Sequence, residues 1–151
     1  MNKNLLEKIN NLNIKPLSKS SITFLEQKLH IDFSPDFIKV CSHANFQYFK
    51  TFEFLNSENE SNYSITGYTI RLRKTSKLPL NTLCLSEDDA SILLMKCLGT
   101  HEEIYWIAIE DYNNYCEEKP LLYSPIIFES FHDFFEYLLK SEEEIDALEA
   151  K

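Results

Sequence analysis

The side chains able to do chemistry in this 151-residue chain are scattered along it, without a recognisable motif. Its histidines stand far apart, without the short spacing at which two histidines share a metal ion. They are His30, His43, His101 and His132. Two glycines cannot form a phosphate-binding loop, and no Gly-x-Ser-x-Gly sequence is present to hold a nucleophilic serine. We therefore expect a protein that is not an enzyme and that uses no cofactor or metal.

The cysteines offer no redox or metal motif either. Cys41, Cys84, Cys97 and Cys116 form no Cys-x-x-Cys pair. Cys116 sits in a polar stretch where it could be exposed, but no helix start or nearby base activates its thiol. Residues 1–7 place charge too close to few apolar residues for a signal peptide, and no run approaches the roughly 18 apolar residues of a membrane span. We expect a cytoplasmic protein with reduced thiols and no membrane contact.

Charge is divided unevenly between the two halves of the chain. Residues 1–80 carry a net charge of +4 and residues 81–151 a net charge of −13, for a total of −9. Such a field attracts a cationic partner and repels the phosphates of nucleic acid, so we expect no nucleic-acid partner. A plainer interpretation is also open, because an acidic surface by itself keeps a cytosolic protein soluble.

Three acidic segments of the C-terminal half provide the candidate binding residues. The first two are short turns at residues 87–89 and 102–103, and the third, residues 110–118, adds two tyrosines to its acids. Acid and tyrosine together suit protein recognition, because the ring supplies contact area and the carboxylate meets a Lys or Arg. The alternative is that the tyrosines simply cover the edge of a sheet. The candidates are Glu87, Asp88, Asp89, Glu102, Glu103, Glu110, Asp111, Tyr112, Tyr115, Glu117 and Glu118.

The first of these segments also has a possible metal-binding interpretation, which the spacing disfavours. Residues 87–89 lack the glycine and the alternating ligand spacing of a calcium loop, so a solvated acidic turn is expected. Successive turns of a meander alternate between its two ends. We therefore expect at most two of the three acidic segments to act together.

Residues 20–44 predict a helix, a tight turn and a second helix. Ser20 or Ser21 is expected to cap the first helix, which stops near His30. Ser34 caps the second, with a proline and an acid in the first turn. The apolar face of this second helix is formed by Phe37, Ile38, Val40 and Cys41. A shorter helix is predicted before this pair, over residues 4–12.

The rest of the chain alternates between extended segments and helix. Alternating aromatic residues predict a strand over residues 46–55, and residues 83–85, 91–97 and 104–109 predict an antiparallel meander. Residues 68–76 fit either strand or helix, and residues 121–127 read as extended. Ser130 is expected to cap a closing helix, with Asp133 at the capping-box position. The apolar stripe of that helix is Phe131, Phe134, Phe135, Leu138 and Leu139, and a frayed acidic end is expected over residues 142–151.

Three segments, in the expected order, resemble the SUKH superfamily, the Smi/Knr-type group of immunity and regulatory proteins. Residues 29–37, LHIDFSPDF, are similar to the opening Leu-Gly-x-x-Leu-Pro-x-Asp-Tyr/Phe, with His30 in place of glycine. Leu78-Pro79, followed by LCL and an acidic turn, is similar to the hairpin Leu-Pro…Ile-x-x-Asp-Gly. Residues 128–139 resemble the closing helix, Ser-Phe-x-x-Phe-Leu. The family is glycine-rich in its turns, whereas this chain has only Gly67 and Gly99, which marks a divergent member.

The resemblance implies a fold and a function. The implied fold is α+β, with helices packed on one side of a mostly antiparallel sheet of about six strands, in a single domain over residues 1–151 with its core at 20–139. It implies a helix within residues 68–76, ending before Pro79. The implied function is an immunity protein that binds and sterically neutralises a cognate polymorphic toxin domain. Such toxins are often nucleases, whose basic grooves an acidic inhibitor can occupy. The alternative is a non-catalytic regulatory or scaffold protein of the Smi/Knr type.

Overall fold

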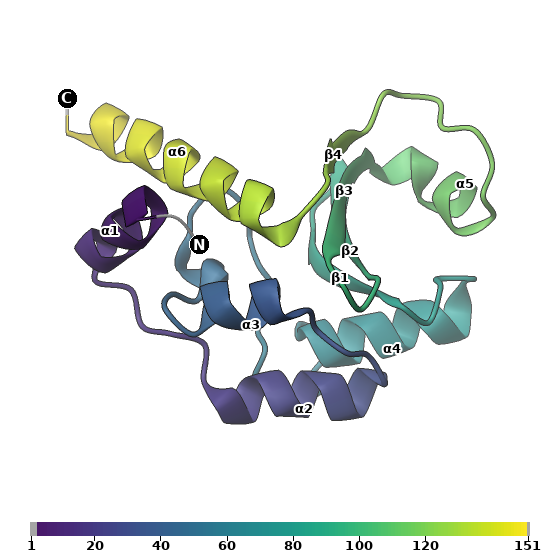
Figure 1. The fold of residues 1–151 in the computed structure, drawn as a ribbon. Helices are drawn as coiled ribbons and strands as arrows, with labels where there is room; N and C mark the ends of the chain where they lie inside the picture. Colours follow the sequence, from purple (N-terminus) through teal and green to yellow (C-terminus); the bar gives the residue numbers. More distant parts are fainter. Residues whose placement is uncertain (1–2, 151) are drawn as a thin grey trace.

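The computed structural model describes residues 3–150, and within them the chain forms six α-helices and one four-stranded sheet (Figure 1). The helices are α1 Lys3–Leu12, α2 Lys19–Leu29, α3 Pro35–Cys41, α4 Ile65–Thr75, α5 Tyr112–Cys116 and α6 Phe131–Glu149. Two short 3-10 helices, η1 Phe46–Tyr48 and η2 Ile109–Asp111, lie between them. The strands are β1 Thr82–Glu87, β2 Ser91–Cys97, β3 Glu102–Ala108 and β4 Ile126–Phe128. The α+β class is confirmed.

The sheet is an antiparallel meander in the order β1-β2-β3-β4. Leu94 of β2 pairs with Tyr105 of β3, which in turn pairs with Ile127 of β4. The predicted meander is confirmed, but the expectation of about six strands is wrong. One predicted strand is irregular, the ambiguous segment is helical, and only residues 126–128 of the C-terminal extended region join the ladder.

The strand predicted over residues 46–55 is absent because the aromatic rings of this segment pack in the hydrophobic core instead. The segment begins with η1 and touches β1 through a single bridge between Phe54 and Ser86. The ring centroid of Phe52 lies 4.9 Å from that of Trp106, and that of Phe54 lies 5.2 Å from that of Phe46. The alternation of aromatic residues therefore reflects ring packing rather than a pleated ladder.

Helices cover both faces of the sheet, so the expectation of helices on one side is wrong. Successive strand residues point to opposite faces, and in β2 both sets are buried. Leu93 and Met95 join the larger core, which also contains apolar residues of α2, α3 and α6. Ile92 and Leu94 join a smaller core that contains residues of α4 and α5. Figure 1 shows α5 lying across the sheet from α3 and α6.

The helix pair is positioned largely as the sequence predicts. The cap of α2 is Ser18 rather than Ser20 or Ser21, since its hydroxyl accepts from the backbone N–H of Ser21 at 3.1 Å. The helix ends at His30, whose φ of 55° is the left-handed conformation that favours glycine. Ser34 caps α3 as predicted. Ile38 is 38% exposed and lies outside the core, unlike the other three residues predicted for that face.

The closing helix is capped by Ser130, which accepts from the N–H of Asp133 at 3.1 Å, and its five predicted stripe residues are buried. The helix continues without a break to Glu149, where the sequence predicted a frayed end from residue 142. Glu142 is buried and accepts from the backbone N–H of Lys50 at 2.9 Å. The ammonium of Lys50 also pairs with Glu149 at 3.0 Å, so the C-terminal half of α6 is held to the segment after η1.

Candidate partner-binding surface

The acidic candidates separate into two groups at opposite ends of the sheet. The turn between β1 and β2 lies against η2, because the N–H of Ile109 donates to the carbonyl of Ala90 at 3.0 Å. We call this region the hairpin end, and its acids are Glu87, Asp88, Asp89 and Glu110. Residues 102–103 pair with the other end of β2, so they lie at the opposite end. This separation agrees with the expected alternation of turns.

Within the hairpin end, Asp88 shapes the turn, whereas Asp89 and Glu110 are free. Its carboxylate accepts from the N–H groups of Ala90 at 2.8 Å and Ser91 at 2.7 Å, and these bonds lower the pKa of Asp88. Asp88 thus organises the turn between β1 and β2. Asp89 and Glu110 are exposed and make no ion pair or side-chain hydrogen bond within residues 3–150. Glu87 is exposed and accepts from the hydroxyl of Tyr68.

Asp111 is not available to a partner, contrary to its place among the candidates. It is fully buried, and its two carboxylate oxygens accept from the N–H groups of Leu122 at 2.7 Å and Tyr123 at 3.0 Å. Burial raises the pKa of Asp111, but these two bonds, together with one from the side-chain amide of Asn114, outweigh that effect and the net pKa is lowered. Asp111 therefore holds the loop that leads to β4, which is a positioning role.

Glu102 is likewise removed from the surface. It has no exposed area, and it accepts from the N–H of Ser34 at 2.7 Å and from its hydroxyl at 2.5 Å. Burial raises the pKa of Glu102, while the bonds from Ser34 oppose the rise only in part. The carboxylate fastens the start of α3 to β3, so this candidate is structural.

We expect Glu102→Gln to become more stable relative to the wild-type protein as pH rises from about 4 to 7. The folded-state pKa of Glu102 lies above its usual 4.5, so the folded protein keeps a proton that the unfolded chain has released. Wild-type stability therefore falls as pH rises through that window. The glutamine keeps a carbonyl for the Ser34 N–H and carries no charge. Urea unfolding of both proteins across this pH range measures the difference.

Glu102→Ala is the matched control for this prediction. It leaves the N–H and hydroxyl of Ser34 without their acceptor, and an unsatisfied buried donor costs about 1–3 kcal/mol. A Glu102→Gln variant whose stability relative to the wild type is constant from pH 4 to 7 would contradict the assignment of a raised pKa.

The segment 110–118 is helical as far as Cys116, and its tyrosines pack on the sheet. Tyr112 is buried in the smaller core, with its hydroxyl 2.6 Å from that of Ser76. Tyr115 is half-buried, and its ring centroid lies 5.3 Å from that of Tyr105. Both therefore cover a face of the sheet, whereas the alternative in the sequence analysis had them covering its edge.

The remaining acidic candidates are Glu103 on β3, and Glu117 and Glu118 in the turn after α5. Glu103 accepts from the hydroxyl of Tyr105 at 2.9 Å and lies opposite Lys96. Glu117 pairs with Lys119 at 2.7 Å, and Glu118 is exposed. Among the candidates, two exposed acids without a partner, Asp89 and Glu110, thus lie at the hairpin end, and one, Glu118, lies after α5.

The cysteine thiols are not activated. Cys41, Cys84, Cys97 and Cys116 are free and buried, so the expectation that Cys116 could be exposed is wrong. Desolvation by burial raises the pKa of all four thiols. A raised pKa keeps the thiol protonated and therefore unreactive at neutral pH.

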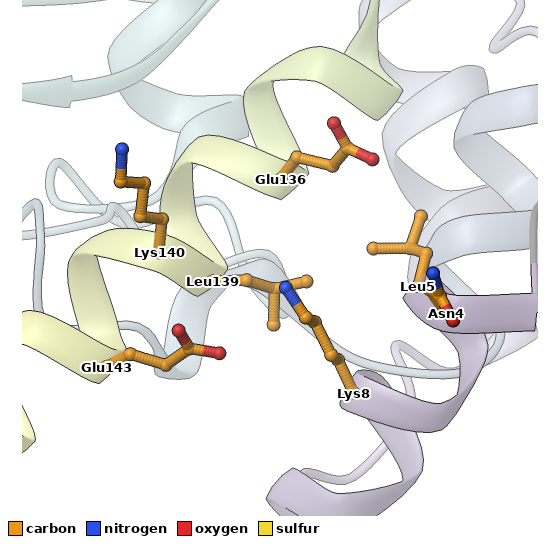
Figure 2. Close-up of a pocket in the computed structure, with 7 residues that line it drawn as sticks. All are labelled: Asn4, Leu5, Lys8, Glu136, Leu139, Lys140 and Glu143. Carbon is orange, nitrogen blue, oxygen red and sulfur yellow. The ribbon is translucent and has the colours of Figure 1, made fainter.

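A hollow of about 360 Å³ lies between α1 and α6, and its lining has mixed charge (Figure 2). Leu5 and Leu139 face each other across it, and Figure 2 shows Lys8 extending from α1 toward α6 while Lys140 points away. Glu136 and Glu143 complete the charged lining. No cysteine, serine or histidine is among the described lining residues of this hollow.

One cluster in the described chain brings potential metal ligands together. His132, Asp133 and Glu136, on the first turns of α6, have ligand atoms within 4.8 Å of one another. The two carboxylates are exposed to water, and the histidine is half-buried. Acidic side chains near the start of a helix interact favourably with the helix dipole even when no metal is bound. The cluster therefore does not by itself define a metal site.

These features describe a class of protein: an α+β domain with an acidic surface and, in the part of the chain that is described, cysteine thiols that are not activated. None of the helices described is long and apolar enough to cross a membrane. A sequence model of the SUKH_5 family, described as SMI1-KNR4 cell-wall, matches residues 2–120. The chain belongs to the SUKH (SMI1-KNR4) family, which is known for immunity proteins that are generally non-catalytic and bind toxins.

The family match covers some, but not all, of the segments in which the sequence resembles the family. It includes the helix pair and the β1–β2 hairpin, and it extends through α1, which the resemblance did not include. It ends before α6, so the likeness of residues 128–139 to the family's closing helix stays a prediction. No curated protein and no solved structure matches the chain.

Proposed function

We propose that the protein is an immunity protein that binds a cognate toxin domain with a basic surface and blocks it sterically. The observation that carries the proposal is the hairpin end, where Asp89 and Glu110 are exposed and unpaired within the half of the chain that carries −13. The substrate groove of a nuclease is basic, so this surface is attracted to it and association is fast. We propose that the protein acts in the cytoplasm, where such a toxin would attack.

A regulatory or scaffold role is the second candidate, and the family description that names the cell wall favours it. The gene directly upstream distinguishes the two roles. A large secreted protein with a variable C-terminal domain supports immunity, while an unrelated operon supports the scaffold. Co-purification of this chain with that C-terminal domain, inactivated in its catalytic site, is the direct test.

We expect the double variant Asp89→Lys, Glu110→Lys to bind that toxin domain more weakly, chiefly through slower association. Both residues are exposed and make no ion pair in the described chain, so folding should change little. The wild-type association rate should fall as salt rises, because exposed charges are screened beyond roughly 10 Å at 0.1 M ionic strength. Surface plasmon resonance at several salt concentrations measures both effects.

A second double variant, Glu143→Lys, Glu144→Lys, controls for net charge. These residues are exposed on α6, and their reversal changes the total charge by the same amount. An association rate that falls equally in the two double variants would show general charge attraction without a role for the hairpin end. A rate that ignores both salt and the Asp89/Glu110 reversal would rule out acidic steering.

A further inference from the structure

The two edges of the sheet differ in whether another segment of the chain covers them. The edge of β1 is covered, since Leu55 donates its N–H to the carbonyl of Leu85 at 2.9 Å and Ser86 donates its hydroxyl to the carbonyl of Glu53 at 2.8 Å. β4 pairs with β3 on one side only. Apart from that ladder, no backbone hydrogen bond of residues 124–129 occurs in the described structure. The outer edge of β4 is therefore open.

This open edge is apolar. Ile126 and Ile127 of β4 are 48% and 47% exposed, and they pair with Trp106 and Tyr105 on opposite faces of the sheet. Leu122 and Tyr123, in the loop just before, are 72% and 59% exposed. Exposed edge strands are usually blunted by charged residues, because their unpaired N–H and C=O groups accept a further strand. Here the strand itself carries none.

One exposed acidic residue follows β4, and another lies at the end of the sheet where β4 begins. Glu129, which is exposed, follows β4 directly. Glu110 lies in η2, directly after the end of β3 that pairs with the start of β4, and the next residue, Asp111, holds the N–H groups of Leu122 and Tyr123. Neither Glu110 nor Glu129 makes an ion pair among residues 3–150. An apolar strand edge between two free acids complements an extended segment with apolar residues in its middle and Lys or Arg at its ends.

We infer that an extended, basic segment of the toxin partner adds to the open edge of β4 as a further strand. The inference rests on the proposed function for the source of the segment. Backbone hydrogen bonds supply the pairing, the exposed apolar side chains around β4 supply buried area, and Glu110 and Glu129 receive the flanking cations. β4 has only three residues, so the side-chain contacts on either side of it are needed as well.

A second copy of this chain fits the edge less well. Antiparallel pairing of two β4 strands about Ile127 would bring the Glu129 end of one strand toward the Glu110 end of the other. Like charges would then meet at both ends, between two chains that each carry −9. Charge thus favours the basic partner over self-association.

The test uses the full chain and the Ile127→Lys variant. We expect this variant to bind the inactivated toxin domain at least about tenfold more weakly, because a lysine on the edge opposes a basic strand and removes apolar contact. Leu80→Lys is the matched control, since Leu80 is 75% exposed in the loop before β1 and the charge change is the same. In the wild-type complex, hydrogen exchange should slow at residues 124–129. This second measurement does not depend on the folding of any variant.

Synthetic peptides provide a second experiment that does not need the toxin domain. A peptide of alternating valine and lysine should shift the NMR signals of residues 122–129, and its valine–glutamate counterpart should not. If the toxin domain fails to bind the wild-type chain, the proposed function fails, and the peptides alone decide whether β4 accepts a basic strand.

Three outcomes would overturn the inference. The toxin could bind while Ile127→Lys and Leu80→Lys match the wild type and exchange at residues 124–129 is unchanged, in which case the immunity role survives on another surface. The basic peptide could leave the signals of residues 122–129 unmoved in a chain that binds no toxin. Sedimentation could reveal a wild-type dimer that Ile127→Lys abolishes, which would make the edge a contact between two copies.

Discussion

Replacing Phe134 with alanine is expected to lower the free energy of unfolding by about 3–5 kcal/mol, which is the usual cost of truncating a buried aromatic ring. Phe134 has no exposed area. Its ring centroid lies 5.2 Å from that of Phe128 and 6.0 Å from that of Phe131, and it also packs on Phe52 and Phe54. One ring thus joins α6, β4 and the segment after η1. A loss of this size is a large share of the roughly 5–15 kcal/mol that stabilises a domain.

Urea unfolding followed by circular dichroism measures this loss, and Leu148→Ala is the control. Leu148 lies on the same helix but is 70% exposed, so its truncation should change stability by well under about 1 kcal/mol. If Phe134→Ala unfolds at the same urea concentration as the wild type, α6 does not pack on the sheet as described.

Gly67→Ala is expected to destabilise the protein by about 1–3 kcal/mol, although alanine favours helix over glycine by about 1 kcal/mol. A Cβ at Gly67 would lie 2.0 Å from the carbonyl oxygen of Ser61 and 2.6 Å from that of Glu60. Both atoms belong to the backbone, so no side chain can rotate to relieve the overlap. The loop before α4 must move instead, and hydrogen exchange over residues 56–64 should speed up.

The Gly99→Ala variant is the control for Gly67→Ala, because it distinguishes the cost of steric overlap from the cost of an unfavourable backbone conformation. Gly99 has a φ of +86°, and a Cβ there would meet no atom within 4 Å. Its replacement is expected to cost about 1–2 kcal/mol through the left-handed conformation alone, without any change in exchange over residues 56–64. If Gly67→Ala is as stable as the wild type and leaves that loop unchanged, the contact between the loop and α4 is not as close as the structure has it.

Local signals in the sequence were sufficient where an element is defined by its own residues. Ser34 and Pro35 start α3 as predicted because capping depends on atoms three residues apart. The meander followed from runs of apolar residues bounded by turns. The irregular segment 46–55 could not be predicted in this way, because its rings are ordered by Trp106 and Phe134, which lie far along the chain.

The candidate surface was predictable only in part for the same reason. Acidic residues are mostly exposed, and that expectation holds for Asp89 and Glu110. It fails for Glu102, whose donor Ser34 lies 68 residues away in the sequence. The open edge of β4 was missed as well. Apolar residues at 121–127 signalled an extended segment, but exposure depends on whether another strand covers it, and nothing local reports that.

The rates at which the four buried thiols are chemically modified would report how the native structure opens. Cys41 and Cys84 have no exposed area, and their thiols are protonated in the native state, so a water-soluble thiol reagent can modify these two only in molecules that have opened. Cys41 lies at the end of α3 and Cys84 and Cys97 on adjacent strands, while Cys116 ends α5. The order in which the four become labelled would therefore map which cores separate first, and a bound partner would slow the labelling of whichever region it holds closed.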